Sequence, residues 1–180
     1  MGTPRLPALV QPFCAVLLAP SLPASEVEAA LCDLFGPLLL RSPAFPFTHT
    51  AYYTREMGPD LQRFFVAFAP LIAMSDLVWY KHRTNRLEAC WAGAGGQRRA
   101  NLDPGYLSLA KVVLASTKDH AHRLYLGAGI YAEVTLSYRQ RRYRPWPWTY
   151  PDYRLPVTLA FFHRLRERYR QRLRQPGGGS

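Results

Sequence analysis

Polar residues that could do chemistry concentrate in one stretch of the chain, residues 101–154. They stand there among strand-like apolar residues and tight-turn signals, and polar side chains held on rigid elements are the usual way to build a site. The set comprises Asp103, Lys118, Asp119, His120, His122, Arg123, Glu133, Asp152 and Arg154. The chain carries no Ser–His–Asp order, no HExxH and no paired-glutamate signature. The stretch therefore predicts a site without naming a reaction.

Asn101 and Asp103 alternate on one face of a predicted strand that ends at a Pro104–Gly105 turn. A carboxylate at a strand end beside a tight turn could act as a base or hold a cation. The simpler interpretation is that Asp103 caps its own turn. Lys118 follows an apolar run, where its amine could meet a phosphate or pair with nearby carboxylates.

A predicted β-hairpin with the loop 127–129 places Glu133 opposite Arg123. A cross-strand ion pair is the structural interpretation. The functional alternative is a carboxylate oriented by Arg123, with His122 on the other face contacting a ligand. His120 and His122 would share one strand face and could begin a metal site, but a third ligand is not evident, so no metal is predicted.

The positive charge lies at one end of the chain. Of the net charge of +11, residues 139–180 supply +9, with 11 arginines against Asp152 and Glu167. Twenty of the 23 basic residues are arginine, whose planar fork suits phosphate. The plainer interpretation is a solvated face whose many arginines reflect the codon usage of a GC-rich genome.

Aromatic residues are interleaved with these arginines, as in proteins that bind single-stranded nucleic acid. The segment comprises Arg139, Arg141, Arg142, Tyr143, Arg144, Trp146, Trp148, Tyr150 and Tyr153. Its proline-rich part could stack bases, or pack as a lid over the sheet. Asp152 and Arg154 are the members that we expect to face a ligand.

Composition bounds the class of protein. A chain of 180 residues with 48% hydrophobic and 19% charged residues fits one globular domain. Three cysteines without a CxxC pair argue against a disulfide framework or a zinc ribbon and favour a cytoplasmic location. The apolar run at 13–19 lies between prolines, which favours a core strand over a signal peptide, and no run reaches the length of a membrane span.

The pattern predicts an α+β fold, a single domain with a mixed or antiparallel sheet. A flexible proline-rich arm (1–12) and a disordered tail (176–180) flank the domain (13–175). The expected elements are a strand at 13–19, a helix to Phe35 with a Ser25–Glu28 capping box, a strand at 38–41, an extended segment at 42–58, a strand or helix at 61–72, a helix from Ser75 to Trp91, a strand at 98–102, a strand or helix at 107–116, a hairpin of 122–126 with 130–138, and an amphipathic helix from Pro156.

Four strings resemble an uncharacterised bacterial family, domain of unknown function 4416. They are FPFTHTAYYTREMG, NLDPGYLSLAKVVLASTKD, HRLYLGAGIYAEVTLSY and PWTYPDYR. Members are often labelled GTP-binding proteins without a mechanism, and the resemblance implies a single domain and no activity. Neither AGAGGQ nor LGAGIY is followed by the Lys-Ser/Thr of a P-loop, so the residues do not support GTP binding.

Two main hypotheses follow. The first is a binding domain for a phosphate-bearing partner, RNA or a nucleotide-like ligand, that uses the basic and aromatic C-terminal region. The second is a small-molecule enzyme with a pocket around Asp103, Lys118, His122 and Arg123, for which Asp103, His122 and Glu133 are the catalytic candidates. A protein-docking module on the final helix is a third possibility. No cofactor and no membrane are predicted, and the sequence leaves the oligomeric state open.

Overall fold

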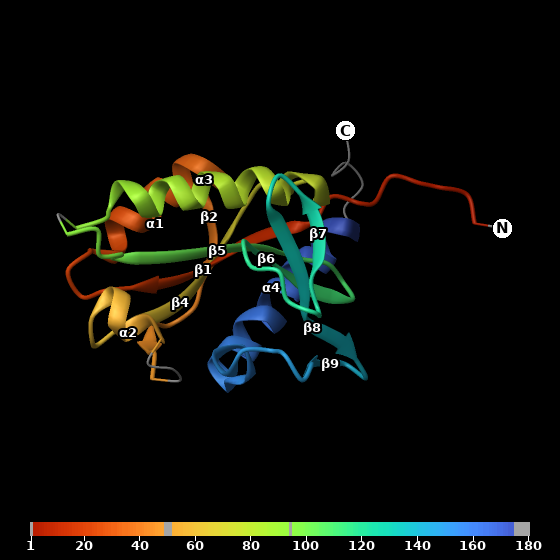
Figure 1. Cartoon of the computed structure of the whole chain (residues 1–180). Coiled ribbons are helices and arrows are strands. Elements are labelled where there is room, and N and C mark those ends of the chain that lie inside the picture. The colour runs from red at the N-terminus through yellow and green to blue at the C-terminus, as the bar shows by residue number, and fades with distance from the viewer. Residues whose placement is uncertain (1, 49–51, 94, 175–180) are drawn as a thin grey trace.

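The computed structural model of the chain describes residues 2–48, 52–93 and 95–174 (Figure 1). The elements in chain order are β1 (Gln11–Leu18), α1 (Ala24–Phe35), β2 (Leu38–Arg41), β3 (Phe45–Pro46), α2 (Tyr52–Met57), β4 (Gln62–Phe68), the 3₁₀ turn η1 (Met74–Asp76), α3 (Leu77–Cys90), β5 (Ala100–Leu107), β6 (Lys111–Ser116), β7 (Leu124–Gly127), β8 (Ile130–Arg139), β9 (Arg142–Pro145), η2 (Pro151–Arg154) and α4 (Pro156–Arg174). The predicted tail at 176–180 lies outside the described residues.

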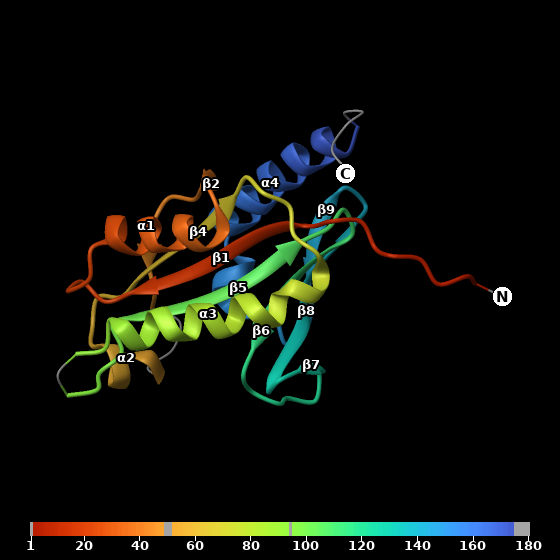
Figure 2. The same ribbon diagram turned by 90° about the horizontal axis from the view of Figure 1, so that it is seen from above.

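The strands of the described residues form one antiparallel sheet in the order β2-β4-β1-β5-β6-β8-β7, with β3 beside β4 and β9 beside β8. Helices α1 and α3 cover one face, and α4 lies on the other (Figures 1 and 2). The predicted α+β class, the initial strand–helix–strand, the later hairpin and the final helix are confirmed.

Strand β1 lies inside the sheet between β4 and β5, and all of its residues are buried. Phe13 and Ala15 pack in the cluster that contains the buried face of α4. Cys14 and Val16 pack on the opposite face, in the cluster that contains the buried residues of α1. Because helices cover both faces, this strand is a continuous apolar run in the sequence, without alternation of polar residues.

Helix α1 begins at Ala24 after Pro23, which occupies the N-cap without a side-chain hydrogen bond. The predicted capping box of Ser25 and Glu28 is therefore wrong. Ser25 already lies inside the first turn, and Glu28 instead accepts a hydrogen bond from Arg41 Nε at 2.6 Å. Glu28 thus forms an ion pair with Arg41 of β2 and does not cap its own helix.

Several segments that the sequence left open are now assigned. The segment 61–72 contains a strand, β4, and the segment 107–116 contains the strand β6. The stretch 42–58 is not simply extended, because it holds the short strand β3 and the helix α2. The helix predicted from Ser75 starts as a 3₁₀ turn and becomes α-helical at Leu77.

The turn predicted at Asp103–Gly105 is wrong, because β5 runs straight through it. All of β5 pairs with β1, and Pro104 lies opposite Cys14. Pairing with β6 begins only at Gly105, opposite Leu114. Gly105 is needed because a Cβ there would come within 2.4 Å of the Phe13 ring and of a β6 carbonyl oxygen. The Asp-Pro-Gly tripeptide therefore lies within a strand, and its glycine allows the close approach of β1 and β6.

On the N-terminal side of Gly105, β5 no longer pairs with β6 and the two strands separate. We call this place the β5–β6 fork (residues 100–104 of β5 and 115–116 of β6). The backbone N–H and C=O of Leu102 both point away from β1, since residues of α3 bind them. Residues two apart in a strand direct their backbone N–H and C=O groups to the same edge, so position 104 faces β6 as Leu102 does. Proline has no backbone N–H, so Pro104 cannot donate a hydrogen bond to β6. The proline thus ends the β5–β6 ladder.

The β7–β8 hairpin pairs Leu124 with Ala132 and Tyr125 with Tyr131. Helix α4 buries an apolar stripe that includes Phe161, Phe162 and Leu165. Within the described residues, no helix combines the length and the apolar character that a membrane crossing requires.

Candidate functional site

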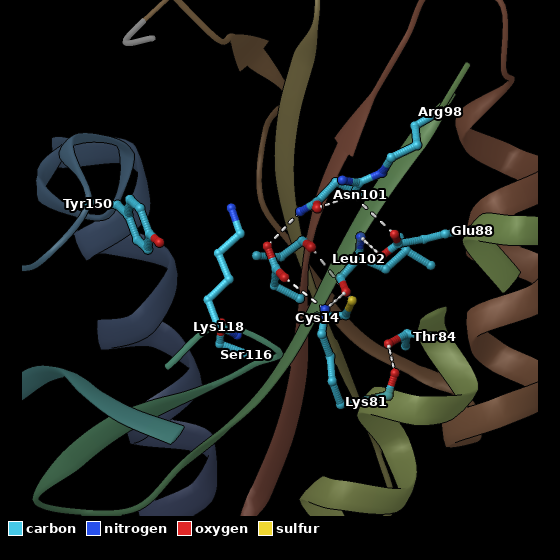
Figure 3. A network of polar contacts seen from close by, with 12 residues as sticks. Cys14, Lys81, Thr84, Glu88, Arg98, Asn101, Leu102, Ser116, Lys118 and Tyr150 are labelled. Atoms are coloured by element: carbon cyan, nitrogen blue, oxygen red, sulfur yellow. Dashed lines mark hydrogen bonds and ion pairs between the residues drawn. The ribbon is translucent and has the colours of Figure 1, made fainter. Parts of the chain in front are cut away.

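Two side chains of α3 replace the missing strand at the β5–β6 fork. Lys81 Nζ donates to the carbonyl of Leu102 at 2.8 Å, and the backbone N–H of Leu102 donates to Glu88 Oε1 at 2.7 Å (Figure 3). Lys81 and Glu88 stand seven residues apart and so lie on one face of the helix. They satisfy the backbone groups that a continued ladder with β6 would have used.

Lys81 also binds Asp103, and the two form the buried centre of the site. Lys81 Nζ lies 2.9 Å from Asp103 Oδ1, and Asn101 Nδ2 donates to Oδ2 at 2.6 Å. Burial would raise the pKa of Asp103, but the charges of Lys81 and Arg63 outweigh it and the pKa is lowered. Burial would lower the pKa of Lys81, but Asp103 and then Glu88 hold it above its usual range. Both groups are charged at neutral pH.

Arg98 extends this network along β5. It donates hydrogen bonds to Asn101 Oδ1 and to Glu88 Oε2 (Figure 3). It also forms an ion pair with Glu56 at 3.2 Å. Burial raises the pKa of Glu88, and Lys81 offsets this rise only in part.

Arg63 and Asp152 form a second buried pair at the other end of the site. Arg63 Nε lies 3.0 Å from Asp152 Oδ2, and the two side chains are 5% and 3% exposed. The angles at this contact are not those of a hydrogen bond. Among the described residues, the enclosed atoms Arg63 Nη1, Asp152 Oδ2 and Tyr153 Oη have no hydrogen-bond partner. Unpaired buried polar groups are costly, so these atoms call for a partner.

Arg123 organises the opposite wall. Its Nε donates to Glu133 Oε2 at 2.8 Å, its Nη1 donates to Ser116 Oγ and to the carbonyl of Lys118, and its Nη2 donates to Tyr150 Oη. The predicted Arg123–Glu133 ion pair is confirmed, with both side chains at most 2% exposed. A single arginine therefore ties the end of β6 to the segment that precedes η2.

These groups surround a cavity of about 490 Å³ in the fork. That volume lies within the range of small-molecule sites, roughly 300–1,000 Å³. Lys118 extends across the space between Tyr150 and Asn101, and the Tyr150 hydroxyl is directed into the same space (Figure 3). The lining comprises Phe47, Tyr53, Arg63, Lys81, Asn85, Glu88, Arg98, Asn101, Asp103, Leu114, Ala115, Ser116, Thr117, Lys118, Arg123, Tyr150, Pro151, Asp152 and Tyr153.

The structure brings together Asn101, Asp103, Lys118, Arg123 and Asp152, all of which the sequence had put forward. Their roles toward a ligand remain predictions.

Other candidates lie outside this lining. His122 and Glu133 stand behind Arg123, with His122 Nε2 3.1 Å from Glu133 Oε2. His122 is thus on the same side as Arg123 and not on the opposite face, because it lies in a turn before β7 begins. Arg154, which we had expected to face a ligand, donates instead to three carbonyls, those of Trp146, Pro147 and Thr149.

The basic and aromatic segment is divided: Tyr150 and Tyr153 line the cavity and Tyr143 is buried, whereas its two tryptophans and its arginines lie outside the lining. Trp146 and Trp148 stack with ring centroids 5.2 Å apart, His122 stacks on Trp148 at 5.2 Å, and His120 stacks on His122 at 5.8 Å. Arg139 lies over the Trp146 ring at 5.5 Å. Arg141 and Arg142 lie exposed at the turn between β8 and β9. In the part of the chain that the structure describes, no cluster of three or more metal-ligating side chains occurs.

Sequence reasoning missed Lys81, Glu88, Arg63 and Arg98. A signal was present in α3, where Leu77, Lys81, Thr84 and Glu88 recur at helical spacing. Charged residues in register with a buried leucine predict a polar group directed at the core. Arg63 gave a similar signal, as a charged residue within an otherwise apolar strand.

Comparison with known proteins identifies the family but not a function. A search of curated proteins and a search of solved structures each returned no match. The sequence model of a domain of unknown function, DUF4416, matches residues 8–169, which is nearly the whole chain. The chain belongs to the DUF4416 family.

Proposed function

We propose that this protein binds a small phosphate-bearing molecule in the cavity of the β5–β6 fork. The observation that carries the proposal is the buried guanidinium of Arg63: this residue lines the cavity, and its Nη1 has no hydrogen-bond partner among the described residues. A guanidinium is the side chain best suited to a phosphate, because its N–H groups form a planar fork.

The distribution of charge supports the same ligand. Five cationic side chains line the cavity against three carboxylates. Lys118 and Arg123 lie on one wall, and Arg63 lies at one end beside Tyr153. A small anion placed there would receive donors from β4, from the end of β6 and from η2.

Acid–base catalysis by Asp103 is less well supported than binding. An efficient general base has a pKa near the working pH. The charges of Lys81 and Arg63 overcome the effect of burial and lower the pKa of Asp103, so this carboxylate is a weak base. Its hydrogen bonds to Lys81 and Asn101 suit a fixed acceptor that orients a ligand.

The test is calorimetric titration with ribose 5-phosphate, and with ribose as the matched neutral probe. We expect binding of the phosphate ester and none of the sugar. Arg63→Gln should weaken that binding about 10- to 100-fold, the loss expected for a hydrogen bond to a charged group of roughly 1.5–3 kcal/mol. Because Arg63 is buried, each variant must show the circular dichroism spectrum of the wild type.

Lys118→Gln provides a second test that leaves the core untouched, since Lys118 lies on the exposed rim. Lys111→Gln is its matched control, because Lys111 begins β6, the strand that ends two residues before Lys118, but does not line the cavity. We expect weaker binding for Lys118→Gln and wild-type binding for the control. Equal affinity of all three proteins, or equal affinity for ribose and its phosphate, would contradict the proposal.

A second candidate function is the binding of single-stranded RNA on the C-terminal surface. One observation favours it: ten of the 11 C-terminal arginines divide into two groups, and the eleventh, Arg139, lies over the Trp146 ring. Arg144, Arg154, Arg166, Arg170 and Arg172 donate hydrogen bonds within the protein. Arg141, Arg142, Arg164, Arg168 and Arg174 are exposed and have no polar partner among the described residues. No polar side-chain contact among the described residues therefore accounts for the second group.

Fluorescence anisotropy with labelled oligouridine tests this candidate. Phosphate contacts release counterions, so binding should weaken steeply between about 50 mM and 200 mM salt. Arg141→Gln with Arg142→Gln should reduce the affinity, whereas Arg83→Gln with Arg86→Gln on α3 should not. If both double variants lose affinity equally, the binding is nonspecific and the candidate is rejected.

A further inference from the structure

The two side chains of the Lys81–Asp103 pair differ in how far they are exposed. The Lys81 side chain is 5% exposed and the Asp103 side chain is 22% exposed. Both residues line the cavity, and Asp103 is the more exposed of the two, so we take its carboxylate as the cavity floor. An ionised carboxylate only accepts hydrogen bonds, so a ligand on this floor must offer donors.

Asp103 retains room for such donors. Lys81 takes one position on Oδ1, and Asn101 takes one on Oδ2. A carboxylate offers about four lone-pair positions, two on each oxygen. One position on each oxygen therefore remains, which is the pattern that two neighbouring hydroxyl groups can fill together.

The opposite side of the cavity has the reverse character. Arg123, Lys118 and the Tyr150 hydroxyl lie on that wall, and the enclosed Arg63 Nη1 and Tyr153 Oη lie at one end. A ligand that fits both sides must carry an anionic group and, a few bonds away, a pair of hydroxyl groups. Alkyl phosphates and simple carboxylates meet only half of this requirement.

We infer that the ligand of the fork cavity is a phosphorylated sugar or polyol, held by its phosphate at the arginine side and by neighbouring hydroxyl groups on Asp103. The inference rests on the proposed function and names the ligand class of the same site. The cavity of about 490 Å³ has room for a five-carbon sugar phosphate.

The experiment compares two probes on the wild-type protein by calorimetry. Ribose 5-phosphate carries the hydroxyl groups, and n-pentyl phosphate has the same number of carbons without them. We expect ribose 5-phosphate to bind at least about tenfold more tightly, the ratio that one net hydrogen bond of about 1.4 kcal/mol gives. Inorganic phosphate is the third probe and reports on the anion site alone.

Asp103→Asn should bring the ratio between the two esters close to one. Its affinity for pentyl phosphate should not fall, since the arginine side is unchanged and a negative charge that acts on Arg63 and Lys81 is removed. Asp103→Asn leaves the buried Lys81 without its carboxylate, so if this variant does not fold, the wild-type ratio decides alone.

The outcomes separate this inference from the proposed function. Equal wild-type affinities for both esters would overturn the hydroxyl inference and leave the anion site standing. Failure of all three phosphate probes to bind would overturn the proposed function, and this inference with it. A tenfold ratio that persists in a folded Asp103→Asn protein would show that another residue reads the hydroxyl groups, and would overturn the assignment to Asp103.

Discussion

Replacing Lys81 by methionine should be among the most destabilising single changes in the domain. Methionine matches the lysine side chain as far as Cε but lacks the ammonium that contacts Asp103 at 2.9 Å and the Leu102 carbonyl at 2.8 Å. Breaking a buried ion pair by removing one partner costs about 3–5 kcal/mol, because the other charge stays buried. Arg63, which also lowers the pKa of Asp103, should hold the loss near the lower end of that range.

A loss of about 3 kcal/mol is a large part of the roughly 5–15 kcal/mol that stabilises a domain. Urea unfolding followed by tryptophan fluorescence measures it. The double variant Lys81→Met with Asp103→Leu should lose less than the two single variants together, because neither charge is then left alone. A single-variant loss below about 1 kcal/mol, or strict additivity, would show that the pair does not stabilise the fork.

The pH dependence follows from the directions of the two pKa shifts. Asp103 has a folded-state pKa below its unfolded value of about 3.9, so its contribution is present above that pH and is lost as the pH falls through the folded-state pKa. Lys81 has a raised pKa, so its contribution is present below about pH 10.4 and is lost as the pH rises through the folded-state value. The stability difference between wild type and Lys81→Met should therefore be constant from about pH 5 to 9 and shrink below about pH 4.

Three further changes test other parts of the fold. Gly105→Ala should lower the unfolding free energy by about 1–3 kcal/mol or more, since its Cβ would come within 2.4 Å of the Phe13 ring; an unchanged melting temperature would contradict the close contact. Arg123→Met should cost about 3–5 kcal/mol, because it leaves a buried carboxylate without its arginine, and urea unfolding checks this. Cys90 is exposed, whereas burial raises the pKa of Cys14, so a thiol reagent should modify Cys90 quickly and reach Cys14 only after unfolding, as mass spectrometry of the labelled peptides would show.

Sequence patterns predicted the fold well where local and tertiary preferences agree. The buried strand β1, the hairpin of β7 and β8 and the amphipathic helix α4 each carry their own period or turn signal. The prediction failed at residues 103–105, where Asp-Pro-Gly normally marks a turn. There the pairing of β5 with β1 over its whole length outweighs the local turn preference. No single-sequence pattern shows which strand will lie beside the tripeptide.

The site was predicted in part, for a related reason. The sequence placed Asp103, Lys118 and Arg123 together because all three fall near strand ends in one stretch of the chain. Lys81 and Arg63 come from elements far away in sequence, and only the order of the strands and the packing of α3 bring them to the fork. Their charges at otherwise buried positions could have been noticed, but their partners could not have been named.

The charged side chains at the β5–β6 fork indicate that the cavity serves a purpose beyond stability. A continued β5–β6 ladder would satisfy the backbone of Leu102 with neutral groups and would bury no charge. The chain instead satisfies it with Lys81 and Glu88, which brings two ionised side chains and their counterions into the interior. Replacing buried ion pairs with apolar residues often leaves stability unchanged or improves it, so stability alone does not favour this arrangement. The fork does gain an opening between two rigid strands, lined by fixed donors and acceptors, and such an opening is what a ligand site requires.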